Sequence, residues 1–229
     1  MPTNAASVEL YWLPLGAGDT PAVVRWSGRA FDALVAHHEH RERQDLYHSA
    51  LEVHLDDERF VIEMTPVWRA NELNRGVVCE GAVGHRWLGH SRFFRYEVHC
   101  WRAGVIPDVT EAVKSPRTVS TNRKQAEQVL ALVSHFPAAT WGRDELHAGE
   151  MWNSNSLISW LLACSGHETS TIDVPTHGRA RGWSAGLVVA KRQTAHAQAR
   201  TTPCTTPSGS AKMTEAPGPI SATTARSSP

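Results

Sequence analysis

Four small polar residues stand directly before an apolar segment, and their types suit chemistry at a helix start. They are Asn153, Ser154, Asn155 and Ser156, followed by the apolar run 157–163. Side-chain oxygens at this position accept hydrogen bonds from the unpaired N–H groups of the first helical turn. A helix N-terminus also presents donors and a positive dipole end to an oxyanion. Two interpretations therefore stand open, an ordinary N-cap and a reaction site.

An earlier part of the chain is predicted to form a hairpin that carries a histidine and a carboxylate. Segments 46–55 and 60–67 are strand-like and are joined by a polar turn at 56–59. His48 lies in the first of these segments and Glu63 in the second. In the first strand, alternation places His48 on one face with Leu46, Ala50, Glu52 and His54, and puts Tyr47, Ser49, Leu51, Val53 and Leu55 on the other.

His48 and Glu63 also have interpretations that need no catalysis. His48 fits a half-buried strand histidine that bonds a backbone group. Glu63 interrupts an apolar run, and either a solvent-facing position or an ion pair with Arg59 explains it equally well.

The order of these two motifs resembles that of the permuted papain-like proteins, which include NlpC/P60-like proteins, lecithin-retinol-acyltransferase-like proteins and PPPDE peptidases. Those proteins place a histidine on an early strand and a nucleophilic cysteine at the start of a later helix. Here Tyr47-His48-Ser49-Ala50-Leu51 precedes Asn153-Ser154-Asn155-Ser156-Leu157, and the resemblance covers these two motifs alone. It implies a cleft with His48 as base, Ser154 in the nucleophile's position and Glu63 on the paired strand as the group that orients the imidazole. The same cleft would be lined by Asn153, Asn155, Ser156 and Trp152.

The chain departs from that family at the nucleophile, where serine replaces cysteine. A thiol of ordinary pKa, about 8.5, can ionise beside an imidazolium, whereas a serine hydroxyl must lose its proton as the bond forms. Two functions follow: a binding module for a small molecule, peptide or partner protein that has lost catalysis, or a hydrolase or acyltransferase that acts on an amide or ester through Ser154 and His48. A third, purely structural interpretation predicts no pocket between the hairpin and the helix.

The remaining histidines and cysteines predict neither a metal site nor a cofactor. On a helix only His37 and His40 have the spacing to share an ion, and a solvated polar face explains them better. The four cysteines are too far apart for a zinc ribbon or a redox pair, so we expect free buried thiols.

Composition excludes some partners and compartments. The 23 basic residues balance 23 acidic ones, which argues against a nucleic acid or a membrane surface as partner. The N-terminus lacks the pattern of a secretion signal and no run reaches the length of a membrane span, so a cytoplasmic protein is expected.

The element pattern predicts a single α+β domain over 1–192, with a central antiparallel sheet and flanking helices, and a disordered tail over 193–229 rich in Thr, Ala, Ser and Pro. Region 107–120 is predicted as a loop or short helix, and Gly166 as a C-cap. Helices are expected at 29–43, 124–133 and 155–165, and strands at 8–13, 22–26, 46–55, 60–67, 76–83, 92–102 and 187–190.

Overall fold

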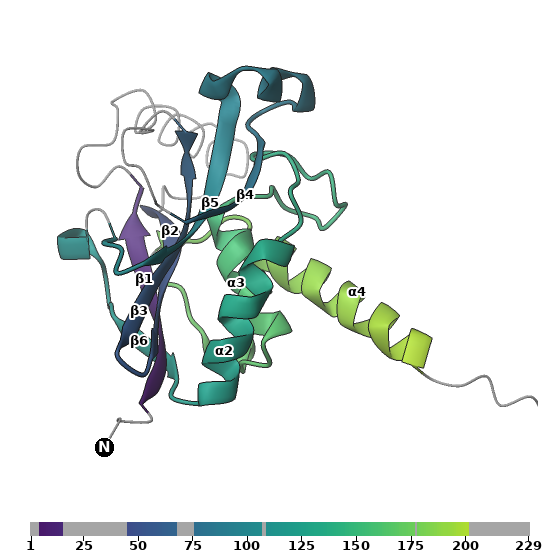
Figure 1. Ribbon diagram of the computed structural model, residues 1–229. Coiled ribbons are helices and arrows are strands. Elements are labelled where there is room, and N and C mark those ends of the chain that lie inside the picture. Colours follow the sequence, from purple (N-terminus) through teal and green to yellow (C-terminus); the bar gives the residue numbers. More distant parts are fainter. Residues whose placement is uncertain (1–4, 16–44, 68–75, 107–108, 177, 202–229) are drawn as a thin grey trace, which may run out of the picture.

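Strands that alternate apolar and polar residues form one antiparallel sheet. Helices α2 and α3 cover one of its faces, and α4 packs on α3 and extends away from the sheet (Figure 1). The computed structural model describes residues 5–15, 45–67, 76–106, 109–176 and 178–201. Within these ranges the predicted α+β class with an antiparallel sheet is confirmed. The predicted elements at 22–26 and 29–43, with His37 and His40, lie outside the described residues.

The sheet has the strand order β4-β5-β3-β2-β1-β6, and each neighbouring pair is antiparallel. The predicted hairpin over 46–67 is confirmed as β2 and β3, with Leu51 opposite Ile62 and Leu55 opposite Glu58. A short strand, β7 (Gly178–Arg179), pairs in parallel with the start of β2. The six main strands are β1 (Ala6–Pro14), β2 (Asp45–Leu55), β3 (Glu58–Pro66), β4 (Val77–Ala82), β5 (Arg95–Arg102) and β6 (Arg117–Ser120).

The three α-helices are α2 (Arg123–Leu132), α3 (Ser154–Cys164) and α4 (Trp183–Thr201). Gly166, the predicted C-cap, follows the end of α3 with φ +77°, a conformation that glycine adopts at little cost. Short 3₁₀ helices complete the described elements: η2 (Arg86–His90), η3 (Arg92–Phe94), η4 (Val109–Glu111), η5 (Val133–His135) and η6 (Thr169–Thr171).

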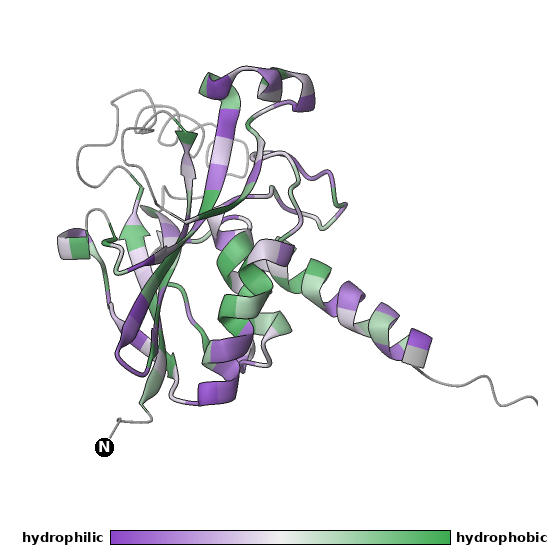
Figure 2. Cartoon of the chain, viewed as in Figure 1, coloured by the Kyte–Doolittle hydropathy of each residue, from purple (hydrophilic) through white to green (hydrophobic). Residues whose placement is uncertain are grey.

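The larger hydrophobic core lies between the sheet and the helices, and α3 is its centre. Figure 2 shows α3 as strongly apolar, and every residue from Ser154 to Leu162 is buried. The sheet side of this core includes Trp12, Leu51 and Ile62. On the opposite face a smaller core collects Tyr11, Leu13, Ala50, Val61 and Ile106. We call the side of the sheet that carries the larger core the helix face, and the side that carries the smaller core the open-side face.

Two predictions about the C-terminal region are corrected. The expected strand at 187–190 is part of α4, because a short apolar run fits either a strand or a buried helical segment. There Gly186 lets α4 approach α3 closely, since a Cβ at this position would stand 2.3 Å from the carbonyl oxygen of Ser156. The helix also continues past 193 to Thr201, since Ala, Lys, Arg and Gln propagate a helix that is already nucleated.

The described cysteines are free thiols, as predicted. Cys79, Cys100 and Cys164 are each half-buried, and burial raises the pKa of Cys100 and of Cys164 to about 11. These thiols therefore stay protonated at neutral pH. None of the helices in the described ranges has the length and apolarity to cross a bilayer.

Candidate functional site

Asn153 forms the N-cap of α3. Its side-chain oxygen accepts hydrogen bonds from the backbone N–H groups of Asn155, at 2.9 Å, and of Ser156, at 3.3 Å. In return the Ser156 hydroxyl accepts from the Asn153 N–H at 3.1 Å, which completes a capping box. The Asn153 amide also donates to the carbonyl oxygen of Arg181, at 2.8 Å. The capping interpretation therefore accounts for Asn153.

Asn155 joins three separate segments of the chain. Its amide nitrogen donates to the carbonyl oxygens of Tyr47 and Arg181, each at 2.9 Å, and its oxygen accepts from the Ser49 hydroxyl at 2.8 Å. All of these groups are buried or partly buried. Asn155 therefore holds the first turn of α3 against β2 and against the loop before α4.

The other two predicted binding residues are also occupied by the protein itself. The Ser156 hydroxyl donates to the carbonyl oxygen of Gly182 at 2.8 Å. Trp152 is 1% exposed, its indole N–H donates to Pro137, and its ring stacks on Phe136 at a centroid distance of 4.9 Å. These side chains hold the protein together and do not face a ligand.

Ser154 and His48 lie on opposite sides of the sheet. Ser154 is buried in the first turn of α3, on the helix face, with 4% of its surface exposed. Tyr47 and Ser49 also point to the helix face, so alternation directs the intervening His48 to the open-side face, next to its strand partner Leu13. The expected nucleophile and base are therefore not brought together.

Burial has a strong effect on His48. Desolvation lowers the pKa of its imidazole from 6.5 to about 4. The side chain is thus neutral at physiological pH, which agrees with the interpretation of a half-buried strand histidine.

Glu63 on β3 lies on the open-side face, as His48 does, but its neighbour comes from β5. It is 5% exposed, which excludes the solvent-facing interpretation, and its register partner on β5 is His99. The His99 imidazole is fully buried, with Nε2 3.0 Å from Oε2 of Glu97. The open-side face therefore carries a buried carboxylate, Glu63, and a half-buried one, Glu97, around the buried imidazole of His99.

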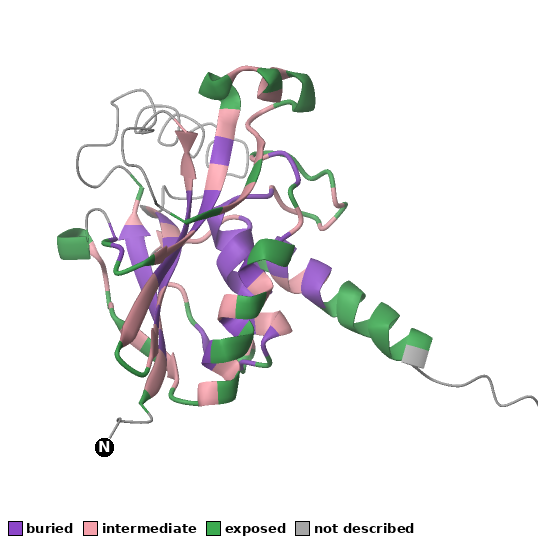
Figure 3. Cartoon of the chain, viewed as in Figure 1, coloured by how far each residue is buried: buried purple, intermediate pink, exposed green. Residues whose placement is uncertain are grey.

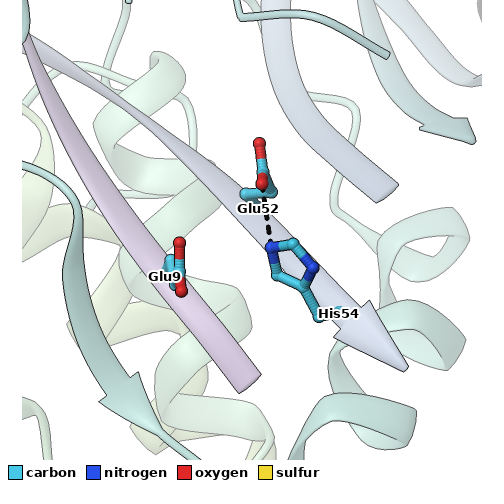
Figure 4. Close-up of side chains that lie close together, drawn as sticks. All are labelled: Glu9, Glu52 and His54. Atoms are coloured by element: carbon cyan, nitrogen blue, oxygen red, sulfur yellow. Dashed lines mark ion pairs between the residues drawn. The ribbon is translucent and has the colours of Figure 1, made fainter. Parts of the chain in front are cut away.

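A second group of ionisable side chains lies on the same face, toward the far end of β1 and β2. Figure 4 shows Glu9 on β1 beside Glu52 and His54 on β2. One ligand atom from each lies within 4.8 Å of the others, and His54 Nε2 is 2.8 Å from Oε1 of Glu52. Glu9 and Glu52 are direct register partners, an arrangement in which like charges destabilise the sheet.

Tyr11 and Arg59 flank this Glu9–Glu52–His54 cluster. Burial, and then the charges of Glu52 and Glu9, raise the pKa of Tyr11 to about 12, so it remains a neutral hydrogen-bond donor. The Arg59 guanidinium lies 3.7 Å from Oε2 of Glu52 and also donates to the carbonyl oxygen of Gly104. Arg59 offsets the charge of one of the two carboxylates. Two carboxylates and an imidazole form a donor set that divalent transition metals accept.

The sequence analysis predicted no metal site and did not identify this cluster, although one of the two patterns that define it is visible in the sequence. Alternation already placed Glu52 and His54 on one face of the strand. The missing step was the pairing of β1 with β2, which brings Glu9 opposite Glu52. His99 was missed for the same reason, because its neighbour Glu63 comes from a separate strand.

Comparisons with protein-family models, curated proteins and solved structures give no match for this chain. The interpretation of the site therefore depends on its geometry alone.

Replacing Asn155 with alanine is expected to destabilise the protein by about 2–4 kcal/mol, because several buried partners lose their hydrogen bonds together. The matched control is Asn122→Ala, which removes the exposed N-cap of α2 and is expected to cost about 1 kcal/mol. Urea unfolding of both variants measures the difference. Equal losses would show that the buried hydrogen bonds of Asn155 contribute no more stability than one exposed cap.

The pH dependence of stability tests the environment of His48. Between pH 6.5 and about 4 the unfolded chain binds the proton more readily than the folded chain, so stability is complete above this window and decreases as the pH falls through it. We expect His48→Gln to reduce that decrease, with exposed His135→Gln as control. His167, whose pKa burial also lowers, contributes a residual slope in both variants. Identical pH profiles for wild type and His48→Gln would contradict the assignment.

Proposed function

We propose that this chain is a binding module without catalysis at Ser154, and that it shares with the permuted papain-like proteins only the order of its elements. The order of elements supports this likeness, since the hairpin of β2 and β3 precedes α3 and the first turn of α3 packs on β2. The loss of catalysis is supported by the positions of Ser154 and His48 on opposite faces of the sheet. Ser154 therefore does not have His48 as the base that a serine nucleophile requires.

We propose a divalent metal ion as the ligand of this module, with Glu9, Glu52 and His54 as its ligands. The observation that carries this proposal is the convergence of one donor atom from each side chain within 4.8 Å. A bound cation would also relieve the repulsion between the two opposed carboxylates. The donor set of two oxygens and one nitrogen suits Mn²⁺ or Zn²⁺.

Binding would replace contacts that exist without the ion. The His54 imidazole would give up the contact of Nε2 with Glu52, so that Nε2 presents a lone pair to the metal while the ring proton moves to Nδ1, and protons compete with the metal for all three ligands. Arg59 would keep its hydrogen bond to Gly104 and remain beside the second oxygen of Glu52. The expected affinity is therefore modest and dependent on pH.

Isothermal titration with MnCl₂ and with ZnCl₂ tests the metal site. Glu9→Gln and His54→Gln are each expected to weaken binding at least roughly tenfold, because each removes one ligand. Glu58→Gln is the matched control, since this glutamate lies at the hairpin turn and pairs with Arg102 outside the cluster. Absence of binding by wild type, or equal binding by His54→Gln, would reject the site.

A fluorophosphonate probe, which labels activated serines, tests the loss of catalysis. We expect no labelling of wild type and no gain of esterase activity in Ser154→Cys, because the side chain at 154 is buried on the helix face. Labelling that disappears in Ser154→Ala would instead support the hydrolase or acyltransferase function.

A further inference from the structure

The connection between β4 and β5 exposes an unusual group of aromatic side chains. Residues 84–94, which we call the tip, contain η2 and η3 and extend past the ends of these strands, away from the three helices (Figure 1). Figure 3 shows much of the tip as exposed. Trp87 is 65% exposed, Phe93 66% and Phe94 43%. Apolar residues gathered in this way on a surface commonly mark an interaction site.

The tip is held in shape by its own backbone. The N–H groups of Leu88, Ser91 and Phe94 each donate to the carbonyl oxygen three residues earlier, at 2.9–3.0 Å. Its base is fixed by Arg143, whose side chain donates to the Gly84 carbonyl oxygen at 2.7 Å. The aromatic side chains are therefore presented by an ordered scaffold, which reduces the entropy lost on binding.

The charged residues of the tip all have the same sign. Arg86 and Arg92 are exposed, His85 and His90 are exposed beside them, and the segment 84–94 contains no Asp or Glu. The Arg92 guanidinium lies 6.0 Å from the Phe93 ring centroid, so cationic and aromatic groups occupy one surface. Glu145 offsets part of the charge of Arg86 at the base of the tip. The remaining positive charge selects an anionic partner.

We propose that the tip binds the surface of an anionic lipid bilayer. Trp and Phe side chains partition into the boundary between headgroups and acyl chains, and nearby arginines bind lipid phosphates. A nucleic acid fits less well, because its affinity depends on many phosphate contacts and the tip offers two arginines. The proposal is independent of the metal site, and the neutral composition of the whole chain conceals this local charge.

Sedimentation of the full chain with phosphatidylcholine vesicles, with or without phosphatidylglycerol, tests the proposal. We expect binding to the vesicles that contain phosphatidylglycerol. The double substitutions Trp87→Ser with Phe93→Ser, and Arg86→Gln with Arg92→Gln, are each expected to reduce partitioning at least roughly tenfold. Val105→Ser and Arg102→Gln are matched controls, because these side chains are exposed outside the tip.

Four results would overturn the proposal. They are no binding to anionic vesicles, equal binding to neutral vesicles, equal loss in the control variants, and self-association in light scattering that Trp87→Ser abolishes. Binding to single-stranded oligo(dT) without binding to vesicles would assign the tip to nucleic acid instead. Circular dichroism of each variant checks that the fold is retained, as expected for exposed positions.

Discussion

The hydrogen bonds of the Asn155 side chain are the constraint on which the rest of this structure depends. They connect the first turn of α3 to Tyr47 and Ser49 of β2 and to the loop before α4. A buried amide is stable only when its donors and acceptors are satisfied, so its partners must lie in one arrangement. That arrangement decides which face of β2 the helix covers, and the two-residue period of the strand then sends His48 to the opposite face.

The same constraint places the packing contacts of α3 on the helix face of the sheet. A group of ionisable side chains then lies on the open-side face. The polar residues at the start of α3 are bound to their own chain, and the apolar residues that follow fill the main core. On the open-side face, Glu9, Glu52, His54, Glu63 and His99 are brought close by pairing between different strands. Glu9 and Glu52 lie opposite each other on paired strands, and the repulsion between two such carboxylates is the basis of the proposal that this face binds a cation.

The tip between β4 and β5 adds a third kind of surface. Its aromatic residues lie on two short 3₁₀ helices, η2 and η3, which precede β5 in the chain. These aromatic side chains do not contribute to either described core. Exposing such side chains to water has a free-energy cost that grows with apolar area. A sheet that binds an ion through paired strands and a membrane through a connecting segment would use two independent parts of one scaffold, because neither depends on the hydrogen bonds of the other.

The sequence by itself determined the local elements and much of the orientation of their side chains. The β2–β3 hairpin, helices α2 and α3, Gly166 and the alternation of His48 with Ser49 all follow from patterns within a few residues. Only the tertiary structure decided that β1 pairs with β2 so that Glu9 faces Glu52, that Glu63 faces His99, and that α3 lies on the side of Ser49. The 187–190 run became helix for a similar reason, since its packing on α3 outweighs a short local pattern. Strand pairing and helix placement depend on contacts between residues far apart in the chain, and periodicity carries no information about such contacts.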